Sequence, residues 1–362
     1  MITGDLDRLL AAEISAAAAR ADGITSAGTW QPAPPGSSPG PGTYATPVAF
    51  RLAGGHPAEA ERIATTFATA LKEAAWIRSA TTAGGYLTVS VTAGALAALA
   101  VRITQAGPAC ARSTALAGTT VRAPRDPGLA AAPDWVQARR RLSESISGRL
   151  AEAAGARILP PDHAERQSSP TGQHRAAAGP VADAMSFAGS GAITYTLARI
   201  PPGAAARADP CLAAAHHAGN PAYAVRYAHA HAAATLRQAA DLGLGLGVAA
   251  EFQPRLLAHP TEQWLLDELS WLPERVAGAA RRARPDVLTR YLERLAGTYF
   301  DCQETRPAMG PGVRTGGPET VARLWLAAAS GTALRAGLHL LGVDAPDRLL
   351  SRGTPTSEGQ GN

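Results

Sequence analysis

Histidine and cysteine side chains, which can bind transition metals, are crowded into one part of this 362-residue sequence. They are Cys211, His216, His217, His229 and His231. Helical zinc sites usually pair ligands three or four residues apart, and other sites use a Cys-x-x-Cys spacing. His229 and His231 are two residues apart and point to different faces of a helix. We therefore expect no metal site and no cofactor.

An aromatic stripe overlaps the same stretch. Tyr223, Tyr227 and His231 recur every four residues, so they share one face of a helix. Exposed nucleic-acid bases stack on such rings, and truncating a ring costs about 1–3 kcal/mol per base. A stripe of this kind can equally pack a core. Both interpretations stay open for Tyr223 and Tyr227.

Arginine is the main positive residue, because Lys72 is the only lysine. Arg139–Arg141 and Arg149 lie in one expected helix and could contact phosphates, although a solvated helix face is the simpler interpretation. The glycines of Gly243–Gly247 follow a helix and not a strand, so they predict a connector and not a phosphate loop. No Ser/His/Asp order or carboxylate pair indicates acid–base chemistry.

The overall composition gives a weak nucleic-acid signal. The formal net charge is +5, which is modest for a protein that binds phosphate backbones. Three widely separated cysteines make a disulfide framework improbable. No apolar run is long enough to span a membrane, and the start lacks a basic region typical of signal peptides. We therefore expect a reduced, soluble, cytoplasmic protein.

Hydrophobic periodicity predicts a mainly α fold with a small α+β N-terminal module. The predicted divisions are an N-terminal module over 1–105, a middle segment over 106–187, a helical domain over 188–350 and a disordered tail over 351–362. The expected helices cover residues 1–20, 57–74, 135–154, 190–199, 221–241, 261–282, 285–301 and 318–342. The expected strands are 86–91 and 119–121, and 32–41 and 160–180 are expected to be loops.

The segment Asn220–His231 resembles the signature helix of arginyl-tRNA synthetases, which runs Asn-Pro, two aromatic positions, then Gln-Tyr-Ala-His-Ala-Arg. In that family it opens the helical anticodon-binding domain called DALR. Later positions follow the same domain in order: Glu262, Leu265, Leu266, Leu269, Leu272 and Pro273, then Pro285, Leu288, Tyr291, Leu292, Leu295, Ala296 and Phe300, then Ala322–Leu324 and Gly337–Val343 with Pro346. The resemblance covers some 160 residues and implies a DALR-like helical bundle.

The resemblance implies RNA contacts, although the family pattern is altered. It places Asn220, Tyr223, Arg226, Tyr227 and His231 at or beside the anticodon-contacting face. Tyr227 matches a family contact position. Arg226 stands where the family has glutamine, and His231 where it has arginine, so specificity for arginine tRNA does not simply carry over.

The N-terminal module resembles the family's N-terminal additional domain more briefly. Gly42–Thr46 is similar to the family's Gly-Asp-Tyr-x-Ser/Thr segment, and Gly84–Val89 to its Gly-Pro-Gly-Phe-Ile-Asn-Phe strand. In the family this module touches the tRNA elbow. The resemblance therefore implies RNA contacts at Tyr86 and Thr88.

The middle segment departs from the family pattern. About eighty residues stand where a Rossmann-type catalytic domain takes roughly two hundred or more. Leu129–Pro133 stands at the place of the HIGH motif, and Thr171–Arg175 at the place of the KMSK loop. Adenylyl chemistry needs positive groups and donors placed around developing charge. We therefore expect a collapsed remnant of the catalytic domain and no catalytic residues.

Two functions fit these observations. The first is a noncatalytic arginyl-tRNA synthetase-like protein that binds tRNA, possibly arginine tRNA, as an adaptor or regulator. The second is a protein-interaction subunit that modulates a full-length synthetase or a tRNA-dependent enzyme, with RNA binding lost. The sequence leaves the tRNA, the protein partner and the oligomeric state open, and it predicts no membrane partner.

Overall fold

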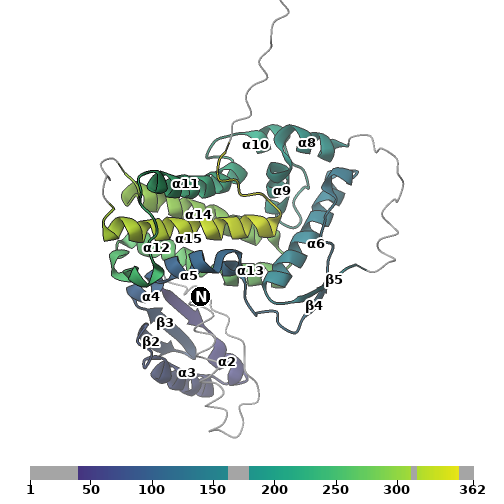
Figure 1. Cartoon of the computed structure of the whole chain (residues 1–362). Coiled ribbons are helices and arrows are strands. Elements are labelled where there is room, and N and C mark those ends of the chain that lie inside the picture. The colour runs from purple at the N-terminus through teal and green to yellow at the C-terminus, as the bar shows by residue number, and fades with distance from the viewer. Residues whose placement is uncertain (1–39, 162–178, 311–315, 350–362) are drawn as a thin grey trace, which may run out of the picture.

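A computed structural model describes residues 40–161, 179–310 and 316–349 of the protein. Its N-terminal module is a three-stranded antiparallel sheet with two helices, seen below the helical body in Figure 1. The strands are β1 (Thr43–Thr46), β2 (Ile77–Ala83) and β3 (Tyr86–Val91), in the order β1-β3-β2. The helices are α2 (Val48–Leu52) and α3 (Pro57–Leu71). The predicted α+β module, its strand over 86–91 and its helix from Pro57 are confirmed.

The N-terminal module is attached to the helical body by specific polar contacts. The backbone N–H of Gly42 donates to Asp267 Oδ1 at 2.8 Å, and Tyr44 Oη donates to Ser270 Oγ at 2.8 Å. The Tyr44 ring also lies 5.2 Å from the ring of Trp271. Helices α4 (Ala93–Ala97) and α5 (Leu99–Ala106) and the 3-10 helix η1 (Gly107–Ala111) then lead into the body.

The middle segment contains one β-α-β unit. Strands β4 (Thr120–Arg122) and β5 (Arg157–Leu159) pair in parallel, and helix α6 (Trp135–Ala153) connects them. A short 3-10 helix, η2 (Leu129–Ala131), lies in the loop between β4 and α6. Parallel pairing requires such a crossover, and this arrangement is the building unit of Rossmann-type folds.

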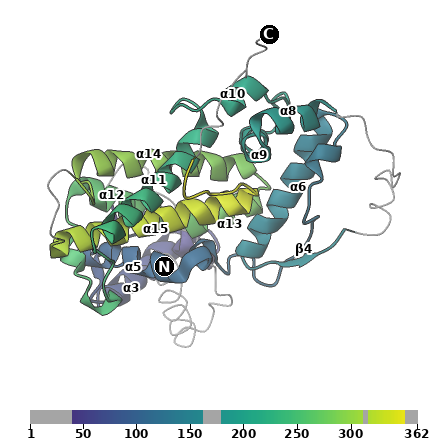
Figure 2. The same ribbon diagram turned by 45° about the horizontal axis from the view of Figure 1, so that its top comes forward.

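The rest of the described chain consists of helices and the loops that join them. Its elements are α8 (Pro180–Ala188), α9 (Ser190–Arg199), α10 (Pro210–Ala214), α11 (Pro221–Asp241), η3 (Ala249–Glu251), η4 (Pro254–Leu256), α12 (Pro260–Ser270), α13 (Leu272–Arg281), α14 (Pro285–Thr305) and α15 (Pro318–Leu341). The predicted mainly α fold is therefore confirmed. Figure 2 shows α11, α14 and α15 running side by side, with α6 at one end of the bundle.

Helix α15 forms the centre of the core. It packs against α11, α14, α5 and η1 and is buried on most of its circumference. A helix that is apolar all round is expected in such a position. Gly337 allows one of these contacts, since a Cβ there would collide with the side chain of Leu292 on α14. Figure 1 shows α15 running beside α11 and α14 and ending near α6 and α9.

One helix prediction is wrong. The single helix expected over 261–282 is two helices, α12 and α13, that meet at Trp271. Pro273 explains the break, because proline has no N–H and its ring clashes with the carbonyl four residues earlier. Proline is tolerated in a first helical turn, which is where α13 places it.

Several predictions concern residues outside the described ranges: the helix over 1–20, most of the loops over 32–41 and 160–180, and the tail over 351–362. The boundaries between the four predicted divisions stay predictions. Within the described ranges no helix is both long and apolar enough to cross a membrane.

Candidate nucleic-acid interface

The helix that carries most of the predicted RNA contacts begins at an asparagine cap. Asn220 Oδ1 accepts a 3.1 Å hydrogen bond from the N–H of Ala222, and Pro221 occupies the first helical position of α11. Asn220 Nδ2 donates to the carbonyls of Ala213 at 3.0 Å and Ala215 at 2.7 Å. Asn220 is buried, so it acts as a cap. A direct contact of its side chain with RNA stays a prediction.

Four rings from two helices and one loop stack in a row, which we call the aromatic ladder: His216, Tyr223, Tyr227 and Phe300. The Tyr223 and Tyr227 rings are nearly parallel, at 8° and 5.6 Å between centroids. His216 stacks on Tyr223 at 5.3 Å, and Phe300 of α14 stacks on Tyr227 at 5.5 Å. The structure thus brings the predicted tyrosines together and adds two rings that the sequence interpretation had not assigned to the site.

The aromatic ladder lies at the surface. Tyr227 is 42% exposed, and Tyr223 and Phe300 are half-buried. The core therefore does not enclose the Tyr227 ring. A base could stack only on ring area that the neighbouring rings leave open, and Tyr227 offers such area.

His231 lies at the inner end of this face. Its Nδ1 is 2.9 Å from the hydroxyl of Tyr299, which is fully buried. Burial lowers the pKa of His231 below its usual value, so the ring is neutral at pH 7. His231 therefore supplies no positive charge where the family pattern has arginine.

Arg226 is half-buried on α11. Its Nε atom has no hydrogen-bond partner among the described residues. Burial lowers its pKa, and the negative charge of Asp344 partly opposes that effect. The guanidinium therefore lies in the field of a carboxylate, which weakens the attraction it offers to a phosphate.

Tyr86 and Thr88 lie in the N-terminal module, away from the aromatic ladder. Tyr86 begins β3, is 51% exposed and makes an edge contact with Phe50 at 5.5 Å. Thr88 is half-buried in the central strand of the sheet, between Ala45 and Thr81. Helix α15 lies between this module and α11 (Figure 1). The two groups of predicted contacts are therefore separate surfaces.

The loop Leu129–Pro133, expected from the sequence at the place of the HIGH motif, is part of the core. Leu129 and Ala132 are buried, and α8 packs against this loop. The helix that follows, α6, is capped by Asp134, whose Oδ1 accepts a 2.8 Å hydrogen bond from the N–H of Gln137. A carboxylate thus occupies the helix N-terminus, a position that can otherwise attract phosphate. Thr171–Arg175 lies outside the described residues.

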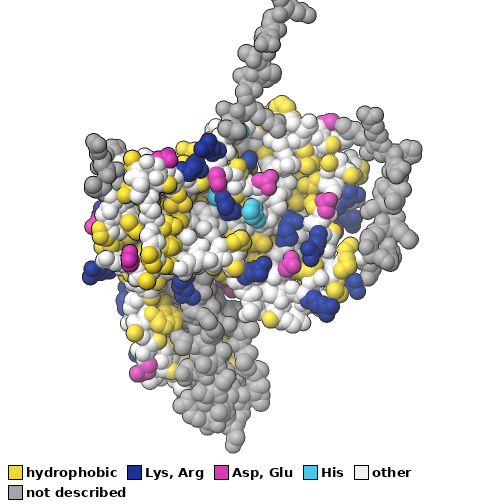
Figure 3. Space-filling model, viewed as in Figure 1, with side chains coloured by type: hydrophobic (Ala, Val, Ile, Leu, Met, Phe, Trp, Pro, Cys, Tyr) yellow, Lys and Arg dark blue, Asp and Glu magenta, His cyan; other side chains and the backbone are white. Residues whose placement is uncertain are grey.

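Surface charge is mixed in sign. Figure 3 shows arginine side chains across the helical body with acidic side chains between them, and no continuous positive area on that face. Among the described residues, no group of three His, Cys, Asp or Glu side chains could hold a metal ion.

From the sequence, Phe300 could be recognised only as an aromatic residue on an expected helix. The fold is needed to show that its ring faces α11 and stacks on Tyr227.

Comparison with known proteins assigns the helical half of the chain. Residues 225–349 match the DALR anticodon binding domain. The arginine–tRNA ligase of Paenarthrobacter aurescens is 38% identical over 175 residues, which cover 46% of this chain and 30% of that protein. The arginine–tRNA ligase of Moorella thermoacetica is 41% identical over 142 residues, covering 38% and 24%. The chain thus spans less than a third of the length of these relatives.

A solved structure shows the same fold relationship. The arginyl-tRNA synthetase of Thermus thermophilus aligns with a TM-score of 0.56 and 14% identity, covering 96% of this chain and 100% of that one. At this identity the likeness concerns the fold alone. Through its C-terminal half, which contains a DALR anticodon binding domain, the protein is related to the arginyl-tRNA synthetase family.

Proposed function

We propose that the protein is a noncatalytic arginyl-tRNA synthetase-like protein that binds tRNA through α11 and α14 as an adaptor or regulator. The observation that carries this proposal is the aromatic ladder, in which Tyr223, Tyr227 and Phe300 stack at the surface of the anticodon-binding domain. We place the protein in the cytoplasm, where tRNA is used.

The ladder suits unpaired bases. Stacking on an aromatic face needs no particular base, because every base has a π-face, and each stack contributes about 1–3 kcal/mol. The area of the Tyr227 ring that its neighbours leave open would therefore contact anticodon-loop bases. Arg226 and the neutral His231 add little charge, so we expect affinity to depend less on salt than for a basic RNA-binding surface.

Two observations support the noncatalytic part of the proposal. The middle segment contains one β-α-β unit with a two-stranded parallel sheet in its described part. The loop before α6 buries Leu129 and Ala132 where an ATP-binding motif would need exposed polar groups.

The experiment is filter binding of the purified protein to total tRNA across a salt series, with sequencing of the bound tRNA. The proposal predicts enrichment of one isoacceptor set and an affinity that falls with salt. Absence of binding at low salt contradicts tRNA binding.

The low positive charge around the aromatic ladder favours a second function. Arg226 is near Asp344, and His231 is held by Tyr299, so the inherited surface lacks two exposed positive groups. The alternative is a subunit that binds a full-length synthetase, or a tRNA-dependent enzyme, without RNA. It predicts that ribonuclease-treated protein forms a complex with purified arginyl-tRNA synthetase in sedimentation velocity. Two independent boundaries would count against it.

A further inference from the structure

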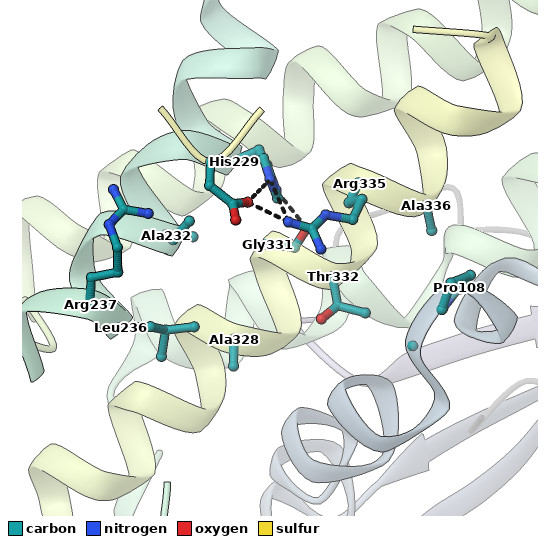
Figure 4. Close-up of a pocket in the computed structure, with 13 residues that line it drawn as sticks. Pro108, His229, Ala232, Leu236, Arg237, Ala328, Gly331, Thr332, Arg335 and Ala336 are labelled. Atoms are coloured by element: carbon teal, nitrogen blue, oxygen red, sulfur yellow. Dashed lines mark hydrogen bonds and ion pairs between the residues drawn. The ribbon is translucent and has the colours of Figure 1, made fainter. Parts of the chain in front are cut away.

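A pocket of about 380 Å³ lies on the opposite side of α11 from the aromatic ladder. Four stretches of chain form it: α11, α15, the 3-10 helix η1, and the segment after α15 that carries Asp347 (Figure 4). The α11 residues that line it are His229, Ala232, Ala233, Leu236 and Arg237. Their spacing of three and four places them on one helix face.

The walls of the pocket are mostly apolar. Ala232 and Leu236 of α11 face Ala328 and Ala336 of α15, and Pro108 of η1 closes one side. The small side chains leave the space unfilled. The volume lies in the range of about 300–1,000 Å³ that is usual for small-molecule sites.

Two arginine side chains and one carboxylate side chain lie at the edges of this apolar space. Arg237 comes from α11 and Arg335 from α15 (Figure 4). Asp347 forms an ion pair with Arg335 and is 55% exposed. Arg237 makes no hydrogen bond or ion pair with another described residue. Its positive charge is therefore unmatched.

His229 lies beside the ion pair of Arg335 and Asp347, and its protonation state affects the charge of the pocket. Its Nδ1 is 3.0 Å from the carbonyl of Gly331, and since a carbonyl only accepts, Nδ1 carries the proton. In the neutral ring Nε2 is then an acceptor. Arg335 Nη2, 3.3 Å away, donates to it, whereas Asp347 Oδ1, 3.2 Å away, receives no hydrogen bond from it. The neutral histidine thus adds no charge, and the pocket has a net charge of about +1 from Arg237, Arg335 and Asp347.

We propose that this pocket binds a small organic carboxylate with an apolar body. The carboxylate of the ligand takes the place of Asp347 on Arg335, Arg237 adds a second positive charge on the α11 wall of the pocket, and the hydrocarbon part fills the space between the alanines. The protein itself shows that a carboxylate fits there, because Asp347 already holds the position. Arginine forks match planar carboxylates with two parallel hydrogen bonds.

Asp347 is suited to being displaced. It comes from the segment 343–349 that follows α15, which has no helix or strand. It contacts Arg335 and His229, and more than half of its side chain is exposed. A ligand that carries both a carboxylate and an apolar body adds contacts that Asp347 lacks. The proposal is independent of tRNA binding, because the aromatic ladder is on the other face of α11.

The test is calorimetric titration of the full chain at pH 7 with hexanoate and benzoate, each compared with its neutral amide. We expect saturable binding of the acids and at least about tenfold weaker binding of the amides, since a charged hydrogen-bonding partner is lost. Asp347→Asn removes the internal competitor, so the acids should bind about 5- to 10-fold more tightly. Arg237→Gln should weaken them by a similar factor without a folding defect.

Arg335→Gln should abolish binding, with thermal unfolding used to confirm that the variant is folded. Tyr227→Ala, on the opposite face of α11, is the control and should bind hexanoate as the unchanged protein does. Equal binding of acid and amide, or unchanged binding in Arg237→Gln, would overturn the proposal. So would the absence of saturable binding to both the unchanged protein and Asp347→Asn.

Discussion

Arg149 of α6 donates a hydrogen bond of 2.9 Å from its Nε to the backbone carbonyl of Leu340, in the last turn of α15. The carbonyls at a helix C-terminus lack partners within the helix, and positive charge is favourable there. Ser145 accepts a second hydrogen bond from Arg149 Nη1 at 2.8 Å. One arginine thus joins the middle segment to the central helix of the anticodon-binding domain.

Replacing Arg149 with alanine is expected to lower the free energy of unfolding by about 1.5–3 kcal/mol, because hydrogen bonds from charged groups have this size. Urea unfolding followed by circular dichroism measures it. The control is Arg140→Ala on the same helix, where an exposed 3.9 Å ion pair with Glu144 should change stability by less than about 0.5 kcal/mol. Equal effects of the two changes would show that the hydrogen bond to α15 contributes nothing.

Gly342 follows α15 with a φ of +76°, a conformation that other residues adopt at a cost. A Cβ there would lie 2.8 Å from Arg149 Nη2. Gly342→Ala should therefore destabilise the protein by about 1–2 kcal/mol or more. The matched change is Gly297→Ala, in the interior of α14 with open space around it, which should stabilise by up to about 1 kcal/mol.

The two effects at Gly342 can be separated. In an Arg149→Ala background the collision is absent and only the backbone strain remains, so Gly342→Ala should cost less there. A double-mutant cycle in urea measures this coupling. A cost that is the same in both backgrounds would show that Arg149 moves aside freely.

Asp267 makes the stability of the protein depend on pH. Burial raises the pKa of this carboxyl to about 6, although it accepts a hydrogen bond from Gly42. The folded pKa lies above the unfolded value, so the contribution is present below about pH 4 and is lost as pH rises through about 6. The loss is up to about 3 kcal/mol.

Asp267→Asn keeps an acceptor for Gly42 and removes the ionisation. Its unfolding free energy should lack the decrease between pH 4 and 7 that the unchanged protein shows, as measured by urea titrations at each pH. Asp301→Asn, an exposed position on α14, serves as the control and should keep the decrease. The assignment to Asp267 fails if its asparagine variant has the same pH profile as the unchanged protein.

Tyr227→Ala should reduce tRNA affinity by about 5- to 100-fold, the equivalent of one lost base stack of about 1–3 kcal/mol. Tyr227→Phe keeps the ring and should bind almost normally. Leu242→Ala removes another exposed apolar side chain from the end of the same helix, roughly 22 Å away, and should have no effect. If Tyr227→Ala and Leu242→Ala reduced tRNA affinity by comparable factors, the aromatic ladder would not be part of the tRNA interface.

The noncatalytic proposal predicts no arginine-dependent exchange of pyrophosphate into ATP, with or without tRNA. A full-length arginyl-tRNA synthetase under the same conditions provides the positive control. Exchange above background that persists after repurification, and that Asp134→Asn alters, would show that the β-α-β unit retains adenylation chemistry.

The start of α11 could be predicted well because its signals are local. Asn220 and Pro221 are a cap and a first-turn proline, and the structure places the helix from Pro221. The same holds for Pro57 in α3 and Pro285 in α14. Periodicity also gave the stripe of Tyr223 and Tyr227, because residues four apart share a helix face.

Features that depend on two distant segments could not be predicted. Phe300 completes the aromatic ladder only because α14 packs against α11. His231 is neutral because the packing of α11 against α14 buries it, beside Tyr299 at a separation of 68 residues in the sequence. The break at Trp271 was missed because periodicity continues across it, although Pro273 was a visible signal.

The central position of α15 has a consequence for biosynthesis. This helix supplies the surface against which α5, η1, α11 and α14 pack, yet it is the last helix of the described chain to leave the ribosome. Helices made earlier expose their apolar faces until Pro318–Leu341 has emerged, and such surfaces are prone to aggregate. We therefore expect the helical body to complete its folding only after Pro318–Leu341 has left the ribosome, and chaperones can shield those faces until then.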